Sequence, residues 1–276
     1  MTAFDFCGAS LHADPSGALV WPDRRLMVVA DLHLEKGAWY AARGIPLPPY
    51  DTGETLDRLE AAIARHRPDR LVCLGDSVHD GDAARRMTPE VVRRILGLAR
   101  GRDWIWIAGN HDPEPDTLPG GRSLAELALA PLVFRHEAAA GPVSGEVSGH
   151  YHPRARIRLR GRTVSGRCFV LDRHRLILPA FGAYAGGLDV TADAFDPLLQ
   201  VEFEILFPGP RRVYRFAGAA EPYPRRVGTT EISTDGRRLA QTVSTWWIEL
   251  LRKSSNSESS SSSPSSSRTK ACCFRM

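Results

Sequence analysis

The sequence has no apolar run long enough to form a membrane span. Its longest uninterrupted apolar stretches are five or six residues, whereas a spanning helix needs about 20. Residues 1–20 also lack the basic start and apolar centre of a secretory signal. We therefore expect a cytoplasmic protein without membrane attachment.

Cysteine is scarce, and no pair has the CxxC spacing of a zinc or redox site. The chain has five cysteines, and an odd number argues against a disulfide framework. Cys7, Cys73 and Cys168 stand singly in apolar surroundings, which is typical of buried, unreactive thiols.

Neither positive nor negative charge is in large excess, since the net charge is only +4. This balance permits a polyanionic partner without requiring one. The chain has 276 residues, of which 43% are hydrophobic and 25% charged, as in ordinary globular proteins. Residues 254–267 are nearly all serine and cannot bury enough apolar surface to fold. We expect a folded domain over 1–216, a C-terminal extension over 217–253 and a disordered tail over 254–276.

Several short apolar segments end in a Gly, Asp, Asn or His. Because strands of an α/β sheet present their ligands at the carboxyl edge, these endings predict one shared site. The segments are 26–30, followed by Asp31 and His33; 71–74, followed by Asp76; 104–108, followed by Asn110, His111 and Asp112; and 146–147, followed by His150 and His152, with His136 in between.

The segments between these strands have apolar residues at helical spacing. Strands that alternate with helices predict an α/β fold. A helix is expected over 51–65 with a capping box of Asp51 and Glu54, and another begins at Thr88 and Pro89. Ser123 is expected to cap a short third helix. After residue 143 the strands shorten (154–160, 168–171 and 175–178), which predicts a second, antiparallel sheet. We expect two packed sheets with helices outside.

The side chains that follow the strands are ligands for Mn²⁺, Fe, Zn²⁺ or Mg²⁺ rather than for copper or iron–sulfur clusters. A single ion rarely uses seven protein groups. Two ions that share a bridging carboxylate would use them all, and such pairs promote in-line attack on phosphorus. The seven candidates are Asp31, His33, Asp76, Asn110, His136, His150 and His152.

The order DLH, GD, GNHD, a lone His and GHYH over residues 26–152 resembles the calcineurin-like metallophosphoesterases. The strings DLHLEKG at 31–37, LPPYDT at 47–52 and GHYHP at 149–153 further resemble the bacterial ligase-associated DNA damage response endonucleases, the PdeM subfamily. The resemblance continues to about residue 190. It implies a four-layer sandwich of two mixed β-sheets flanked by helices.

The resemblance also implies a role for each motif residue. Asp31, His33 and His152 would hold a first metal, while Asn110, His136 and His150 would hold a second, with Asp76 bridging. Water activated by both ions would attack phosphorus. His111 would assist the leaving oxygen as a general acid or charge stabiliser, and Asp112 would orient the His111 imidazole.

Two further groups have an ambiguous pattern. Arg154, Arg156, Arg158 and Arg160 alternate after GHYH, so on a strand they share one face. That row suits either the phosphates of a nucleic acid or a solvated edge that blocks strand pairing. His79 and Asp80 lie near the site or form a solvated turn.

We therefore expect a two-metal phosphodiesterase, a DNA endonuclease linked to repair, with Mn²⁺ as its metal. DNA is its expected partner, alongside repair proteins such as a DNA ligase, helicase or exonuclease. One alternative is a phosphodiesterase or phosphatase of small nucleotides or phosphate esters. Another is a non-catalytic binding module on the same fold.

Overall fold

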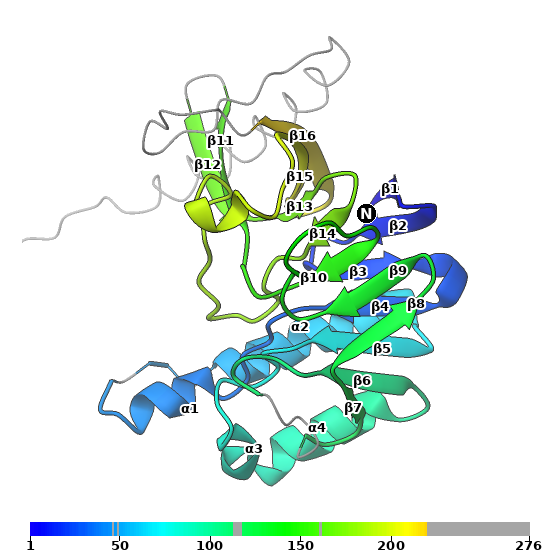
Figure 1. Ribbon diagram of the computed structural model, residues 1–276. Coiled ribbons are helices and arrows are strands. Elements are labelled where there is room, and N and C mark those ends of the chain that lie inside the picture. Colours follow the sequence, from blue (N-terminus) through cyan, green and yellow to red (C-terminus); the bar gives the residue numbers. More distant parts are fainter. Residues whose placement is uncertain (46, 49, 113–117, 160–161, 220–276) are drawn as a thin grey trace, which may run out of the picture. The chain divides into compact units, whose positions relative to one another are not determined.

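The computed structural model describes residues 1–45, 47, 48, 50–112, 118–159 and 162–219 (Figure 1). The expected tail over 254–276, nearly all of the extension over 217–253, and Arg160 lie outside these residues. The division into 1–216, 217–253 and 254–276 therefore stays a prediction. Of the three described cysteines, Cys73 and Cys168 are buried free thiols, as expected, and Cys7 is half-buried.

The first sheet has seven strands in the order β1-β2-β3-β4-β5-β6-β7. The first pairings are antiparallel, and those from β4 to β7 are parallel. Buried apolar side chains fill the central strands, so both faces of this part of the sheet must be covered. The strands are β1 (Thr2–Phe6), β2 (Ala9–Ala13), β3 (Leu19–Trp21), β4 (Leu26–Val29), β5 (Arg70–Leu74), β6 (Asp103–Ile107) and β7 (Arg122–Leu124).

Helices cover the outer face of this sheet (Figure 1). They are α1 (Lys36–Ala41), α2 (Asp51–His66), α3 (Ala83–Arg86) and α4 (Pro89–Ala99). The Thr88 hydroxyl accepts a hydrogen bond from Val91 N at 3.3 Å, which confirms the predicted start of α4. The predicted capping box is wrong. Asp51 is inside α2, and its carboxylate accepts instead from Gly37 N at 2.8 Å, which ties α1 to α2.

The second sheet also has seven strands, in the order β16-β15-β13-β14-β10-β9-β8. It is mixed rather than antiparallel, because β10 runs parallel to both β9 and β14. Ser123 begins no helix, since residues 122–124 extend the first sheet as β7 and pair with β6. The strands are β8 (Glu126–Leu129), β9 (Leu132–Arg135), β10 (Glu146–Ser148), β13 (Phe169–Leu171), β14 (Arg175–Ile177), β15 (Glu202–Pro208) and β16 (Val213–Ala219).

The main apolar core lies between the two sheets and includes Leu26, Val72, Phe134 and Phe169. Among the described residues the α-helices flank the first sheet, and the 3-10 helix η3 (Asp193–Phe195) lies beside the second (Figure 1). On the outer side of the second sheet, a separate ribbon of β11 (Arg154–Leu159) and β12 (Arg162–Arg167) lies where a helical layer was expected. Side chains such as Ile157 of that ribbon pack with Phe203. No helix among the described residues is long and apolar enough to cross a membrane.

Arg175 ties the second sheet together from a buried position. Its Nε donates to Glu146 at 2.8 Å, and its other nitrogens donate to the carbonyl oxygens of Leu198, Ala139 and Gly141 at 2.6–2.7 Å. Arg175→Met should lower the free energy of unfolding by about 3–5 kcal/mol. It removes the nearest cation from the buried Glu146 carboxylate, which keeps only Arg135 at 3.6 Å and the Ala139 N–H, and it takes a donor from three carbonyl oxygens. Urea unfolding measures this. Arg173→Met, at an exposed arginine nearby, is the control. Equal free energies of unfolding for the two variants would contradict the prediction.

Candidate metal centre

Parallel strands of both sheets deliver the candidate ligands to one place. Asp31 and His33 follow β4, Asp76 follows β5, His136 follows β9, and His150 and His152 follow β10. Among the described residues, nine other than glycine have a positive φ, and five of these are candidate ligands: Asp31, His33, Asp76, His150 and His152. A left-handed backbone is unfavourable for such residues and clusters at functional sites, so the fold sustains strain here to aim these side chains.

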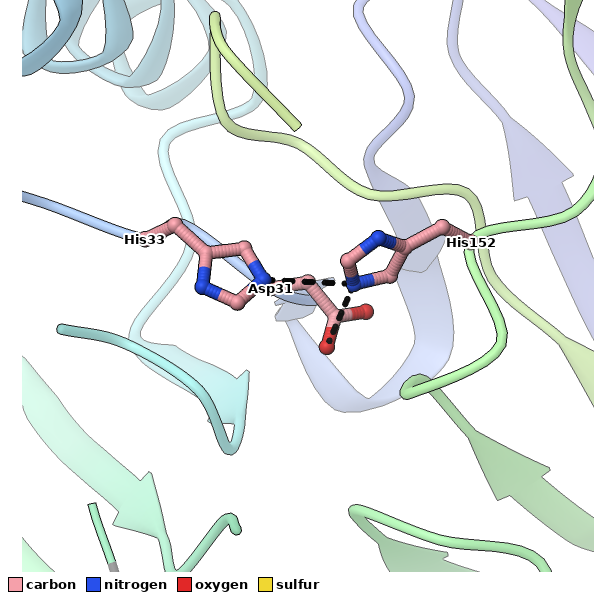
Figure 2. Close-up of side chains that lie close together, drawn as sticks. All are labelled: Asp31, His33 and His152. Atoms are coloured by element: carbon pink, nitrogen blue, oxygen red, sulfur yellow. Dashed lines mark hydrogen bonds and ion pairs between the residues drawn. The ribbon is translucent and has the colours of Figure 1, made fainter. Parts of the chain in front are cut away.

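The first half of the centre is formed by Asp31, His33 and His152 (Figure 2). His152 Nε2 lies 3.3 Å from Asp31 Oδ1 and 3.3 Å from His33 Nε2. Asp31 is fully buried, and both its carboxylate oxygens accept from His150 N, at 3.1 and 3.0 Å. The three side chains therefore converge on one point from two segments that lie far apart in the sequence.

The second half is formed by Asp76, His136 and His150. His136 Nε2 lies 3.4 Å from Asp76 Oδ1 and 3.1 Å from His150 Nδ1. His136 Nδ1 lies 2.9 Å from the carbonyl oxygen of Leu74. Because a carbonyl can only accept, Nδ1 carries the proton and Nε2 of the neutral ring is left to bind a ligand.

The protonation of these residues suits a divalent cation. Burial, reinforced by His152 and Lys36, lowers the pKa of His33 to about 2. Burial, reinforced by His136, also lowers the pKa of His150. Imidazoles and buried carboxylates that converge in this way make a nitrogen and oxygen donor set fitted to such ions.

A third group of possible ligands, formed by His33, Asp76 and His111, overlaps both halves. Within it, His33 is shared with the first half and Asp76 with the second. The structure thus brings together six of the seven predicted ligands in a continuous cluster. The seventh, Asn110, is exposed and lines, with His136, a neighbouring pocket of about 390 Å³.

His111 lies at the mouth of the centre, with 45% of its side chain exposed. Its backbone N–H donates to Asp76 Oδ1 at 2.9 Å, and its ring Nδ1 donates to the carbonyl oxygen of His79 at 2.8 Å. Ring Nε2 lies 4.0 Å from Asp76 Oδ2 and faces the centre. This atom can therefore contact either an ion or a bound substrate.

Asp112 does not orient the His111 ring, which corrects the expectation from the motif. Its buried carboxylate instead accepts from the N–H groups of Asp76, Ser77 and Val78, at 2.9, 2.7 and 3.4 Å. Burial, together with the charge of Asp76, raises the pKa of Asp112 to about 6, although these donors oppose the shift. Asp112 thus holds the turn that carries Asp76.

His79 belongs to the centre rather than to a solvated turn. It is 8% exposed, and its ring stacks on that of His111 with centroids 5.2 Å apart. The Trp39 ring, which sequence reasoning missed, meets the His79 ring edge-on, with centroids 4.8 Å apart. No motif includes Trp39. Its position shortly after the DLH motif is the one signal in the sequence that could have indicated a place near the site. Asp80, by contrast, pairs with Arg86 at 2.6 Å.

The described part of the arginine row lies on β11, directly after His152. Arg156 and Arg158 are exposed, whereas Ala155 and Ile157 between them are buried, as the alternation predicts. Arg154 is half-buried. Arg156 makes one long ion pair, 3.9 Å from Asp189.

Comparisons with known proteins agree with this geometry. Residues 24–173 match the family model of the calcineurin-like phosphoesterases. Among solved structures, the chain is similar to the nuclease MPE of Pseudomonas putida, with 28% identity and a TM-score of 0.58 over 77% of this chain and 99% of that one. A search of the curated proteins finds no match. With its family model, its two-sheet fold and its converging ligands, the chain belongs to the calcineurin-like phosphoesterase family and is a metal-dependent phosphoesterase.

Proposed function

We propose that this phosphoesterase is a two-metal phosphodiesterase that cuts DNA. The observation that carries the proposal is the position of Asp76, whose carboxylate is shared by two groups of possible ligands. A carboxylate in that position can touch two ions at once, and paired ions about 3.5–4 Å apart are the usual device for in-line attack on phosphorus.

In this proposal Asp31, His33 and His152 would hold one ion, and Asn110, His136 and His150 would hold the other. The ions would supply Lewis acidity that polarises the phosphoryl group and lowers the pKa of the attacking water. His111 Nε2 faces the centre and assists departure of the leaving oxygen. The His79 carbonyl fixes which ring nitrogen of His111 is available for that task.

DNA is proposed as the substrate because of the surface next to the centre. Arg156 and Arg158 project from one exposed face of a ribbon that begins two residues after His152, and guanidinium groups bind backbone phosphates. The similar Pseudomonas putida protein is a nuclease. A role in DNA repair beside a ligase, helicase or exonuclease, and Mn²⁺ as the working metal, complete the proposal.

A substrate panel tests this proposal. Metal-free protein is supplied with Mn²⁺, Fe²⁺, Zn²⁺ or Mg²⁺ and assayed on bis-p-nitrophenyl phosphate, supercoiled plasmid, oligonucleotides and mononucleotides. We expect cleavage of the chromogenic diester and of DNA, with the highest rate in Mn²⁺. Hydrolysis of mononucleotides without any cutting of DNA would replace the proposal with a small-molecule phosphoesterase.

The arginine row gives a prediction specific to polymers. The double variant Arg156→Gln/Arg158→Gln should weaken DNA binding, and the slope of log affinity against log salt should fall by roughly 1–2, because one or two phosphate contacts are lost. Turnover of bis-p-nitrophenyl phosphate should not change. Arg93→Gln on α4, far from the ribbon in Figure 1, is the charge-matched control. Unchanged DNA binding in the double variant would remove the row from the interface.

A further inference from the structure

Residues 180–190, here called the strap, form backbone hydrogen bonds with both segments that carry the first half of the centre (yellow-green in Figure 1). At one end, Phe181 N donates to the carbonyl oxygen of Ala30 at 2.7 Å, and Gly182 N donates to that of Asp31 at 3.1 Å. At the other end, Arg154 N donates to Leu188 O at 2.7 Å, and Val190 N donates to Arg154 O at 2.8 Å. The strap thus touches the backbone of Asp31 and the strand that starts two residues after His152.

The strap is itself firmly held. The Phe181 side chain is fully buried in the core beneath the helices. Arg58 on α2 donates to Phe181 O at 2.8 Å, and Ala183 N donates to the Thr55 hydroxyl at 3.0 Å. The Tyr184 hydroxyl donates to Pro48 O at 2.9 Å. Because these contacts hold the strap in place, the strap can hold the backbone of the residues that it contacts.

Two glycines allow the strap to approach so closely. A Cβ on Gly182 would collide with the carbonyl oxygen of Leu32, between Asp31 and His33. A Cβ on Gly187 would collide with the carbonyl oxygen of His152 and lie 2.7 Å from Arg154 Cγ. Backbone carbonyls cannot rotate away as a side chain can, so either methyl group would displace a segment that carries ligands.

We propose that Gly182 and Gly187 are positioning residues for the half of the centre formed by Asp31, His33 and His152. The proposal rests on the metal-centre assignment under Proposed function. Asp31, His33 and His152 all have a left-handed backbone. Such conformations persist only where the surroundings over-determine them, and the strap supplies that constraint from outside the ligand set. Among the described residues, its backbone hydrogen bonds go to neither Asp76, His136 nor His150.

The neighbouring residue provides a matched control. Gly186 is exposed like Gly187, and a Cβ there would meet no atom within 4 Å. Gly186→Ala therefore makes the same chemical change, one residue away, without touching the ligand segments. Because Gly187 lies in the exposed part of the strap, Gly187→Ala should fold even if the buried Gly182→Ala does not.

The test is calorimetric titration of Mn²⁺ into metal-free full-length protein, with melting temperature measured on the same samples. Wild type and Gly186→Ala should bind two ions alike. Gly187→Ala and Gly182→Ala should weaken one binding event about 10–100-fold, the usual cost of disturbing groups that orient metal ligands, and should leave the other unchanged. Excess Mn²⁺ should restore kcat while KM for DNA stays constant.

The outcomes separate the strap from the proposed function. Wild type that binds a single ion would overturn the two-metal proposal, and the strap would then stand only if Gly187→Ala weakens that ion. If wild type binds two ions, the decisive sample is folded Gly187→Ala. Binding of both ions by this variant with unchanged affinity would overturn the role of the strap. A Gly187→Ala variant that weakens both ions equally would also overturn it.

Discussion

Asp76→Asn should remove both metal ions and lower phosphodiester turnover by about 10³-fold or more, which corresponds to about 4 kcal/mol of transition-state stabilisation. The carboxylate is nearly buried, lies 3.4 Å from His136 Nε2 and accepts from His111 N at 2.9 Å. Asparagine keeps this shape and tolerates the left-handed backbone of Asp76. It removes only the charge that would be shared by two cations.

Elemental analysis and turnover measured on the same preparation test this expectation. Asp103→Asn is the matched control. Asp103 begins β6, so it lies at the amino end of the parallel strands, whereas Asp76 follows their carboxyl end, and it pairs with Arg70 and Arg122. That variant should keep both ions. Two bound ions and near-normal turnover in Asp76→Asn would contradict the bridging role.

His111→Ala should keep both ions and lose roughly 10²–10⁴-fold in turnover of DNA, the usual range for general acid–base assistance. Nδ1 of this ring is occupied by the His79 carbonyl, so only Nε2 can act at the centre. The loss should be much smaller on bis-p-nitrophenyl phosphate, whose leaving group departs without a proton. The alkoxide released from DNA is far more basic and needs the assistance.

Metal content and both rates in this one variant decide between two roles for Nε2. Loss of an ion would make His111 a ligand, in agreement with its place beside His33 and Asp76. Equal penalties on the two substrates would exclude assistance to the leaving group. The exposed His174 lies outside every motif, and His174→Ala should match wild type in all three measurements.

Much of this architecture could be predicted from residue patterns, because strong local signals agreed with the global fold. The apolar runs before Asp31, Asp76 and Asn110 are strands of one sheet, and their polar endings meet because parallel strands share a carboxyl edge. Thr88 followed by Pro89 is a local helix start that needs no tertiary context.

Other features depend on contacts between distant residues, which a local pattern cannot encode. Asp51 matches a capping box, but the N–H of Gly37 takes its carboxylate. Ser123 resembles a helix cap, yet pairing with β6 draws its segment into the sheet. Asp112 follows His111 directly in the chain, but its carboxylate turns to three N–H groups more than thirty residues away.

The central claim is that two ions act together on one phosphodiester, and one measurement tests it most directly. Metal-free protein receives Mn²⁺ in fractions of one equivalent, and the rate of bis-p-nitrophenyl phosphate hydrolysis is recorded at each step. We expect little activity up to one equivalent of Mn²⁺ and a steep rise between one and two. Full activity at one equivalent, or none after two have bound, would contradict it.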